Sequence, residues 1–428
     1  MRNSKAKAVV GAVVFIFIFV LIASALSYAL APASSLTRLS LHEFYEQEDI
    51  DILILGASHP LHGIDSTMLD DLTEKNTYNL ASASQKALDS YYLLREAYEE
   101  SEIETVIIEL TYGMYTKFSG YDNPLSSMIL FDYMKASANK AAYFWDAFAP
   151  EDWLEAILPA YRYREELPEM FVNLKTKLSP AYMAFDEAAG SYADEVYRGK
   201  GFAAGLDAFE DGNMGRVSPY KWDKTIINEE ELGYLEKMIS LCREKGSRVI
   251  LLSIPMPYAT LLQIGNYDEV HTFFADFAAE KGLPYFDLNL LPESAFARTD
   301  DLYYDSTHLI ETGAKAITPI IAKIIAGNMP SLADHFSEME AQLGLESVYL
   351  QVTKIGDRAD VSAKVICGAA AEAEYRIAIK RADGTEEILT DFAEAAKTSF
   401  KFKPGDELIC YAREAGKETI SHWDSYIF

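Results

Sequence analysis

A serine, an aspartate and a histidine stand at positions from which they could carry out nucleophilic chemistry together. Ser58 follows an apolar run at residues 50–55 through a small-residue turn, and Asp305 lies three residues before His308. A serine hydroxyl needs a base to take its proton, and histidine is a better base when a carboxylate holds its second ring nitrogen. The three residues therefore predict a nucleophile, a base and an orienting acid.

Each part of this pattern also has an ordinary structural explanation. A Gly-x-Ser sequence after a strand is common in turns, and an Asp-x-x-His sequence is typical of a helix start at which the acid caps backbone amides. The joint placement favours catalysis, because both segments are expected at the carboxyl edge of a parallel sheet, where open α/β sheets bind ligands. His59 and His62 lie beside the serine and either bind substrate or only shape the turn.

The elements that must position these residues follow a strand, turn and helix rhythm. This rhythm predicts a parallel sheet with right-handed crossovers. Strands are expected at residues 50–55, 77–80, 104–110, 248–254 and 284–288, and helices at 87–100, 229–245, 268–281 and 311–326. The α/β domain is assigned to residues 35–326, and Asn79 is expected to hold the loop after the second strand, with substrate contact as the alternative.

A long segment at about residues 113–228 interrupts the rhythm. Its first half is aromatic-rich and predicts helices, whereas residues 199–215 are rich in glycine and predict a loop. Because it leaves the third strand at the carboxyl edge, it is expected to reach over Ser58 as a lid or substrate platform. Its aromatic side chains, from Tyr143 to Tyr163, fill a core or stack on sugar faces.

The C-terminal region has a different pattern. Residues 327–345 predict a helical linker, and residues 346–428 contain short strands separated by turn signals, which is typical of a small β-sandwich. This all-β domain either binds glycan or only stabilises and spaces the enzyme. Cys367 and Cys410 lie in two of its strands, where they either pair or remain buried thiols.

The N-terminal segment is long and apolar enough to cross a membrane. Three basic residues precede residues 9–31, which carry no charge, so residues 1–34 are interpreted as a cytoplasmic stub and a transmembrane anchor. The alternative is a cleaved signal peptide, because small-residue sites follow the apolar run. Both interpretations place residues from about 35 onward outside the cytoplasm. Residues 32–48 are expected to be a polar spacer with a short helical pattern around residues 41–48.

Composition excludes several functions. The formal net charge is −28, which argues against nucleic-acid binding because phosphate contacts need clustered Lys and Arg. The three cysteines form no CxxC motif, and no HExxH motif is present. We therefore expect no metal and no cofactor.

The two ends of the pattern resemble the SGNH (GDSL-like) hydrolase superfamily, whose first block carries the nucleophilic serine and whose last block carries an Asp-x-x-His pair. The resemblance covers roughly residues 48–326 and implies a flavodoxin-like α/β/α sandwich, here with a helical insertion. This sequence departs from the family in reading Gly56-Ala57-Ser58 in place of Gly-Asp-Ser.

The oxyanion blocks also depart from the family. The resemblance places the oxyanion glycine of the second block near Ser84, and it places the asparagine of the third block after the third strand, where Thr111-Tyr112-Gly113 stands instead. Loss of such a side-chain donor costs about 3 kcal/mol in the barrier unless another group replaces it. Gln85, Tyr112 or a group from the insertion is expected to do so.

The anchor and the altered blocks make the chain look most like membrane-attached acyl-transfer proteins of the cell envelope, the alginate O-acetylation and teichoic acid D-alanine-transfer types. This resemblance implies an acyl-serine at Ser58 and transfer to an extracytoplasmic polysaccharide or teichoic acid-like acceptor, with a membrane-bound O-acyltransferase as partner. Two alternatives remain: an esterase or deacetylase acting on envelope glycans, and a non-catalytic surface module that retains the fold.

Overall fold

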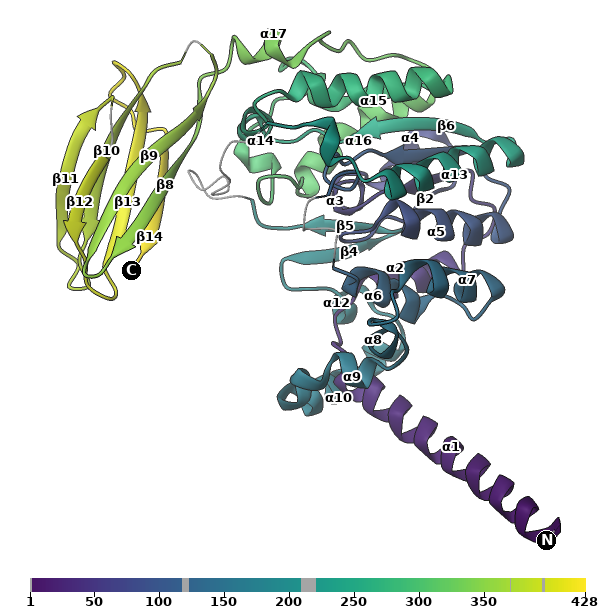
Figure 1. The fold of residues 1–428 in the computed structure, drawn as a ribbon. Coiled ribbons are helices and arrows are strands. Elements are labelled where there is room, and N and C mark those ends of the chain that lie inside the picture. Colours follow the sequence, from purple (N-terminus) through teal and green to yellow (C-terminus); the bar gives the residue numbers. More distant parts are fainter. Residues whose placement is uncertain (1, 118–122, 209–220, 370, 395–396) are drawn as a thin grey trace.

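A five-stranded parallel sheet forms the centre of the computed structural model, which describes residues 2–117, 123–208, 221–369, 371–394 and 397–428 (Figure 1). Its strands lie in the order β2-β1-β3-β6-β7. Their bounds are Ile52–Leu55 (β1), Thr77–Asn79 (β2), Thr105–Glu109 (β3), Arg248–Ser253 (β6) and Tyr285–Asp287 (β7). The order reverses between β1 and β3, so the switch point, where such sheets bind ligands, lies beyond the carboxyl ends of these two strands.

Helices cover both faces of this sheet, because alternate strand residues point to opposite sides. Leu53 and Leu55 of β1 belong to one apolar core, and Ile52 and Ile54 belong to another on the opposite face. The helices that pack with the sheet are α4 (Ser66–Thr73), α5 (Ala87–Glu100), α13 (Glu229–Lys245), α15 (Tyr267–Lys281) and α16 (Glu311–Ile325). This three-layer arrangement confirms the predicted α/β/α class.

The N-terminal helix α1 (Arg2–Leu30) extends away from this body (Figure 1). Among the residues described, it is the one helix whose length and hydropathy suffice to cross a membrane, over Val9–Leu30. The segment after it was expected to be a polar spacer with a short helix around residues 41–48. A helix is present, but it begins earlier, and the segment is packed into the body and is not a spacer. It forms α2 (Leu36–Phe44), which is capped by Ser35 and buries Phe44 completely in the main core.

The insertion between β3 and α13 is largely helical, as predicted. Its helices are α6 (Leu125–Tyr133), α7 (Ala138–Ala147), α8 (Trp153–Ile157), α9 (Pro159–Arg162), α10 (Met170–Lys177), α11 (Pro180–Met183) and α12 (Glu187–Gly190), with a 3-10 turn at Arg164–Glu169. Tyr143, Phe144 and Phe148 fill cores, which confirms the packing interpretation for these aromatic residues, whereas Trp145 is exposed.

The expected loop at residues 199–215 contains a β-hairpin instead, although residues 209–220 lie outside the described part of the chain. Strands β4 (Glu195–Gly199) and β5 (Phe202–Gly205) pair antiparallel. Gly201 makes the turn possible, since its φ is +79° and a Cβ there would lie 1.7 Å from the Asn79 carbonyl oxygen. The glycines therefore mark a tight turn docked on the end of β2.

Seven antiparallel strands form the C-terminal region as two sheets, β11-β10-β13-β14 and β12-β9-β8, around a shared apolar core. They are β8 (Leu345–Ile355), β9 (Arg358–Cys367), β10 (Ala373–Lys380), β11 (Glu386–Ala393), β12 (Lys397–Lys401), β13 (Glu407–Glu414) and β14 (His422–Ile427). Cys367 and Cys410 are unpaired, which agrees with the thiol alternative. Helix α17 (Phe336–Glu340) lies in the segment that leads into this region.

Candidate active site

Ser58 is the first residue of the short helix α3 (Ser58–Gly63), directly beyond the carboxyl end of β1. The turn that delivers it requires glycine at position 56. A Cβ on Gly56 would lie 2.7 Å from Cγ of Pro60 and 2.9 Å from Cβ of Glu109. The close approach of β1, α3 and the end of β3 thus fixes the direction in which the serine leaves the sheet.

The structure brings Ser58, His308 and Asp305 into one hydrogen-bonded line, although 250 residues separate the serine from the histidine. The Oγ of Ser58 lies 2.6 Å from Nε2 of His308. The Nδ1 of His308 lies 2.8 Å and 3.0 Å from the two carboxylate oxygens of Asp305. Because a carboxylate can only accept, Nδ1 donates and Nε2 is left to accept the serine proton, which is the tautomer that general-base catalysis needs.

Asp305 is held as an anion by its own loop. Its Oδ1 accepts the backbone N–H groups of Thr307 and His308 at 2.7 Å and 2.9 Å. Burial by itself would raise the pKa of Asp305, but the hydrogen bond and charge of His308 and the two backbone donors outweigh burial and hold that pKa well below its ordinary value. The carboxylate therefore stays charged over the whole physiological pH range.

His62 faces the triad from the last turn of α3. Its Nδ1 donates to the backbone carbonyl of Ala203 on β5 at 2.8 Å, and its ring centroid lies 5.5 Å from that of His308. Burial, followed by the neighbouring His308, lowers the pKa of His62 to about 4. A neutral His62 adds no second positive charge beside the base, and its Nε2 lies 3.8 Å from a carboxylate oxygen of Glu195.

His59 lies on the opposite side of the base, against the end of β3. Its ring centroid is 5.3 Å from that of His308, and its Nδ1 is 3.7 Å from Oε1 of Glu109. Glu109 is fully buried and accepts the hydroxyl of Thr111 at 2.5 Å. The two histidines flanking the serine thus brace the turn, and His59 has its closest polar neighbours in Glu109 and Thr111.

The expected oxyanion residues are used elsewhere in the described structure. Asn79 is buried, donates to the Pro60 carbonyl at 2.7 Å and accepts from the backbone of Ala81 at 3.1 Å, so it holds the loop to the start of α3. Gln85 is also buried and uses its amide on Ser82 and Ser90. Both amide groups therefore have hydrogen-bond partners within the chain.

The two further candidates are Ser84 and Tyr112. Ser84 lies in the same loop with a φ of +52° and is partly exposed. Tyr112 packs against the main core and lines a small cavity that also contains Glu109 and Thr111. The side chains at the third-block position therefore turn into the body of the protein.

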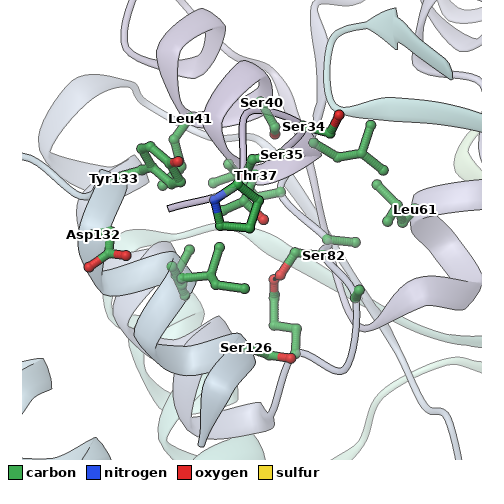
Figure 2. A pocket seen from close by; sticks show the side chains of 18 of the residues that line it. Ser34, Ser35, Thr37, Ser40, Leu41, Leu61, Ser82, Ser126, Asp132 and Tyr133 are labelled. Carbon is green, nitrogen blue, oxygen red and sulfur yellow. Dashed lines mark hydrogen bonds between the residues drawn. The ribbon is translucent and has the colours of Figure 1, made fainter. Parts of the chain in front are cut away.

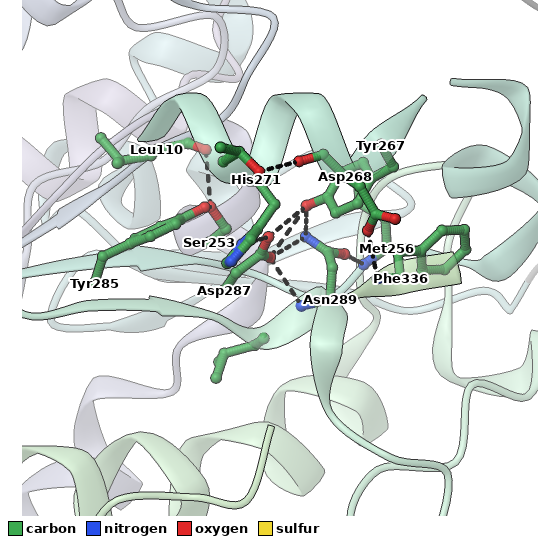
Figure 3. A network of polar contacts seen from close by, with 12 residues as sticks. Leu110, Ser253, Met256, Tyr267, Asp268, His271, Tyr285, Asp287, Asn289 and Phe336 are labelled. Carbon is green, nitrogen blue, oxygen red and sulfur yellow. Dashed lines mark hydrogen bonds and ion pairs between the residues drawn. The ribbon is translucent and has the colours of Figure 1, made fainter. Parts of the chain in front are cut away.

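A buried network stabilises the next part of the sheet edge (Figure 3). Asp287, at the end of β7, accepts from the Tyr267 hydroxyl at 3.0 Å and from Nδ1 of His271 at 3.0 Å. Asn289 accepts the backbone N–H of Met256 at 2.8 Å. The network ties the segment after β6 to β7, beside the small cavity next to α3.

A larger cavity, of about 140 Å³, lies on the other side of α3 (Figure 2). Leu61 of α3 and Glu195 of the hairpin line its end near the triad, and α2 and α6 line the rest. Hydroxyl groups and aliphatic side chains alternate on its wall, as Ser35, Ser82 and Leu41 illustrate. Such a mixed wall suits a ligand with both polar and apolar parts.

Sequence reasoning missed the groups that neighbour the base. The carboxyl groups of Glu109 and Glu195 lie close to His59 and His62, and the Ala203 carbonyl sets the tautomer of His62. A glutamate that ends a buried apolar strand, as Glu109 does, was a detectable signal, because buried carboxylates are rare without a partner. Glu195 and Ala203 lie on a hairpin that was not predicted, because its glycines indicated a loop.

Comparisons with known proteins find similar solved structures, two of which are described here. No protein-family model and no curated protein matches the chain. One similar structure, from Bacteroides fragilis, is described as a "putative acylhydrolase"; it is 11% identical with a TM-score of 0.30 and covers 67% of this chain and 94% of that chain. A GDSL-like lipase from Bacteroides thetaiotaomicron is 9% identical with a TM-score of 0.31, covering 69% of this chain and 100% of that chain. Because both TM-scores are low, the assignment of the site rests on the geometry of Ser58, His308 and Asp305.

Proposed function

We propose that this protein is a serine-dependent acyltransferase, anchored in the membrane by α1, which transfers an acyl group through Ser58 to a hydroxyl of an extracytoplasmic glycan. The line of hydrogen bonds from Ser58 through His308 to Asp305 carries the proposal. Its distances are those of a nucleophile, a general base and an orienting acid. The arrangement also counts against a non-catalytic module, which has no need of a serine aligned on a partly exposed histidine.

In the proposed first step, Oγ of Ser58 attacks the carbonyl carbon of an acyl donor while Nε2 of His308 takes the hydroxyl proton. Asp305 stabilises the imidazolium that forms. The tetrahedral intermediate then collapses, the bond to the leaving group breaks, and the leaving group receives the proton from His308. The product of this step is an ester on Ser58.

In the second step, Nε2 of His308 deprotonates the acceptor hydroxyl, whose oxygen attacks the acyl-serine. The bond between the acyl carbon and Oγ breaks, and Ser58 recovers its proton from His308. Water in place of the glycan would give hydrolysis by the same steps. The side chains near the serine are bonded elsewhere, so the proposal assigns the oxyanion to backbone N–H groups at the start of α3.

Contacts at the end of α1 support an uncleaved anchor. Lys177 is buried and donates to the backbone carbonyls of Tyr28 and Ala31 at 2.6 Å each. The hydroxyl of Ser27 accepts the backbone N–H of Ala160 at 2.9 Å. Cleavage after residue 31 or 33 would remove these partners from the folded insertion, so we propose a single-pass protein with residues 35–428 outside the cytoplasm.

The partners belong to the same proposal. The acceptor is an envelope polysaccharide or a teichoic acid-like polymer, and a membrane-bound O-acyltransferase supplies the acyl group. The side chains of His308 and Asp305 are 22% and 39% exposed, which supports transfer to a large acceptor, since a polymer could not enter a closed pocket.

The test compares water with a sugar hydroxyl as the acceptor of the acyl group. The full-length protein is incubated with an activated acetyl ester, with and without an acetyl-free oligosaccharide, and acetate and acetylated sugar are both quantified. We expect sugar acetylation to exceed hydrolysis, and we expect Ser58→Ala to abolish both. Release of acetate alone would support an esterase and overturn the transferase, and full activity in Ser58→Ala would overturn the assignment of the nucleophile.

A further inference from the structure

A groove of about 740 Å³ runs along the outer half of α1. One wall is the helix itself at Phe19, Val20 and Ala23, and the opposite wall is apolar and includes Ile157 and Met183. The groove extends from Phe19 to Ala31, which corresponds to about 18 Å of helix, or somewhat more than half of a hydrocarbon core of about 30 Å. Its length therefore matches one leaflet.

The insertion that forms the second wall is apolar on its outside as well. Helices α9 and α10 lie beside the end of α1 (Figure 1). Phe171 of α10 is 74% exposed, and Val172, Leu178 and Ile157 are exposed too. Exposed apolar side chains grouped around the end of a membrane helix are typical of a segment that enters the lipid interface. The groove is thus expected to open to lipid.

The inner end of the groove is cationic. Arg38 is 7% exposed and stacks between the rings of Tyr182 and Phe185, 3.8 Å and 3.9 Å from its guanidinium carbon. Its Nη2 donates to the Tyr182 carbonyl at 2.9 Å, whereas its Nη1 has no hydrogen-bond partner within the described parts of the chain. A buried, rigidly held guanidinium with an unused donor is a strong site for an oxygen anion.

A second cation lies beside it. Lys177 also lines the groove, and burial, followed by the charge of Arg38, lowers the pKa of Lys177 to about 8. Neither cation forms an ion pair with a carboxylate of the described residues, and Asp132, which lines the same groove, is paired with Arg162. In a chain with a net charge of −28, two neighbouring cations whose partners among the described residues are carbonyls and not carboxylates point to an anionic ligand.

We propose that this groove binds an anionic phospholipid of the leaflet that faces residues 35–428, with the phosphate at the end lined by Arg38 and Lys177 and an acyl chain along α1. The part of the groove lined by Phe19, Val20 and Ile157 favours a lipid over free phosphate, because these side chains offer hydrocarbon contacts. The site rests on the uncleaved anchor but not on acyl transfer. It shares Ala31, Asp132 and Tyr133 with the cavity beside α3, so the bound headgroup faces the body that carries Ser58 (Figure 2).

The test uses the full-length protein in phosphatidylcholine vesicles that contain a small fraction of phosphatidylglycerol with a photoreactive diazirine in one acyl chain. Adducts are mapped by mass spectrometry. We expect labelling to concentrate on the groove residues of α1 and on Met183, and we expect Arg38→Gln to reduce it at least fivefold. Arg164→Gln, which removes an exposed arginine of the same insertion, should leave labelling unchanged.

A second pair of variants keeps the test valid if Arg38→Gln fails to fold. Ala23→Trp fills the groove without touching its charges and should reduce labelling, whereas Ala25→Trp, on an exposed part of α1 outside the groove, should not. Ser58→Ala should be labelled like the unaltered chain, which separates this site from the proposed enzyme activity. Uniform labelling around α1, equal labelling of both tryptophan variants, or displacement of the lipid by millimolar inorganic phosphate would overturn the proposal.

Discussion

Replacing Asp305 by asparagine should disable the base while leaving the loop folded. The Oδ1 of Asp305 accepts two backbone N–H groups, from Thr307 and His308. An amide must keep its oxygen at that position, so its NH₂ group takes the place of Oδ2, 2.8 Å from Nδ1 of His308. Nδ1 then has to accept, Nε2 carries the proton, and Ser58 loses its base.

The size of the effect follows from the loss of the correct tautomer. In serine triads this loss lowers turnover by about 10⁴-fold, which is roughly 5.4 kcal/mol in the barrier. The Asp305 side chain is 39% exposed, so solvent screens its charge. We therefore expect a loss of about 10³-fold, or roughly 4 kcal/mol.

The assay is the second-order rate at which a fluorophosphonate labels Ser58, because this reaction needs an activated serine but no knowledge of the natural donor. His308→Ala serves as the reference for complete loss of the base, and thermal unfolding of each variant controls for folding. A folded Asp305→Asn variant that is labelled within tenfold of the unaltered rate would refute the tautomer argument.

Three other perturbations have outcomes that the structure predicts. Gly56→Ala should destabilise the protein by about 1–3 kcal/mol and slow labelling of Ser58, because the added Cβ meets Glu109; thermal unfolding and labelling rates check this. The pKa of His62 is about 4 in the folded protein, so below pH 6.5 the unfolded chain binds a proton that the folded chain does not, and the free energy of unfolding decreases as the pH is lowered. His62→Gln should reduce the stability lost between pH 7 and pH 4.5 by about 2 kcal/mol, as measured by denaturant titration. Lys177→Met should cost about 1–3 kcal/mol in the free energy of unfolding, because two carbonyls at the end of α1 lose their donor; Lys175→Met is the exposed control.

Much of the fold was predictable because the parallel strands are continuous apolar runs. The run at Ile52–Leu55 predicted β1 and its turn, and the glycines at positions 246 and 282 marked the ends of α13 and α15. In each case the local pattern and the tertiary role agree, since a strand buried on both faces has to be apolar throughout.

Two segments escaped prediction because tertiary contacts decide their structure. The polar residues of α2 suggest a spacer, yet this helix buries Phe44 and Arg38 against distant parts of the chain. The hairpin β4–β5 looks like a loop because Gly199 and Gly201 dominate its sequence, and its turn exists only through contact with Asn79.

Some residues of the site could be predicted from the sequence and others could not. Ser58, Asp305 and His308 could be proposed from sequence because each follows or precedes a recognisable element. The oxyanion candidates depended on which side chains were free, and only packing shows that Gln85 and Asn79 are already bonded. Hydrogen-bond partners of that kind leave no periodic trace in the sequence.

The most direct test of Ser58 as the nucleophile is the location of the covalent adduct formed by a fluorophosphonate on the full-length folded chain. Peptide mass spectrometry should find the phosphonyl group on Ser58, and the adduct should be absent in Ser58→Ala and at least 10³-fold slower to form in His308→Ala. An adduct on another serine, or a folded protein that is not labelled at all, would contradict the account.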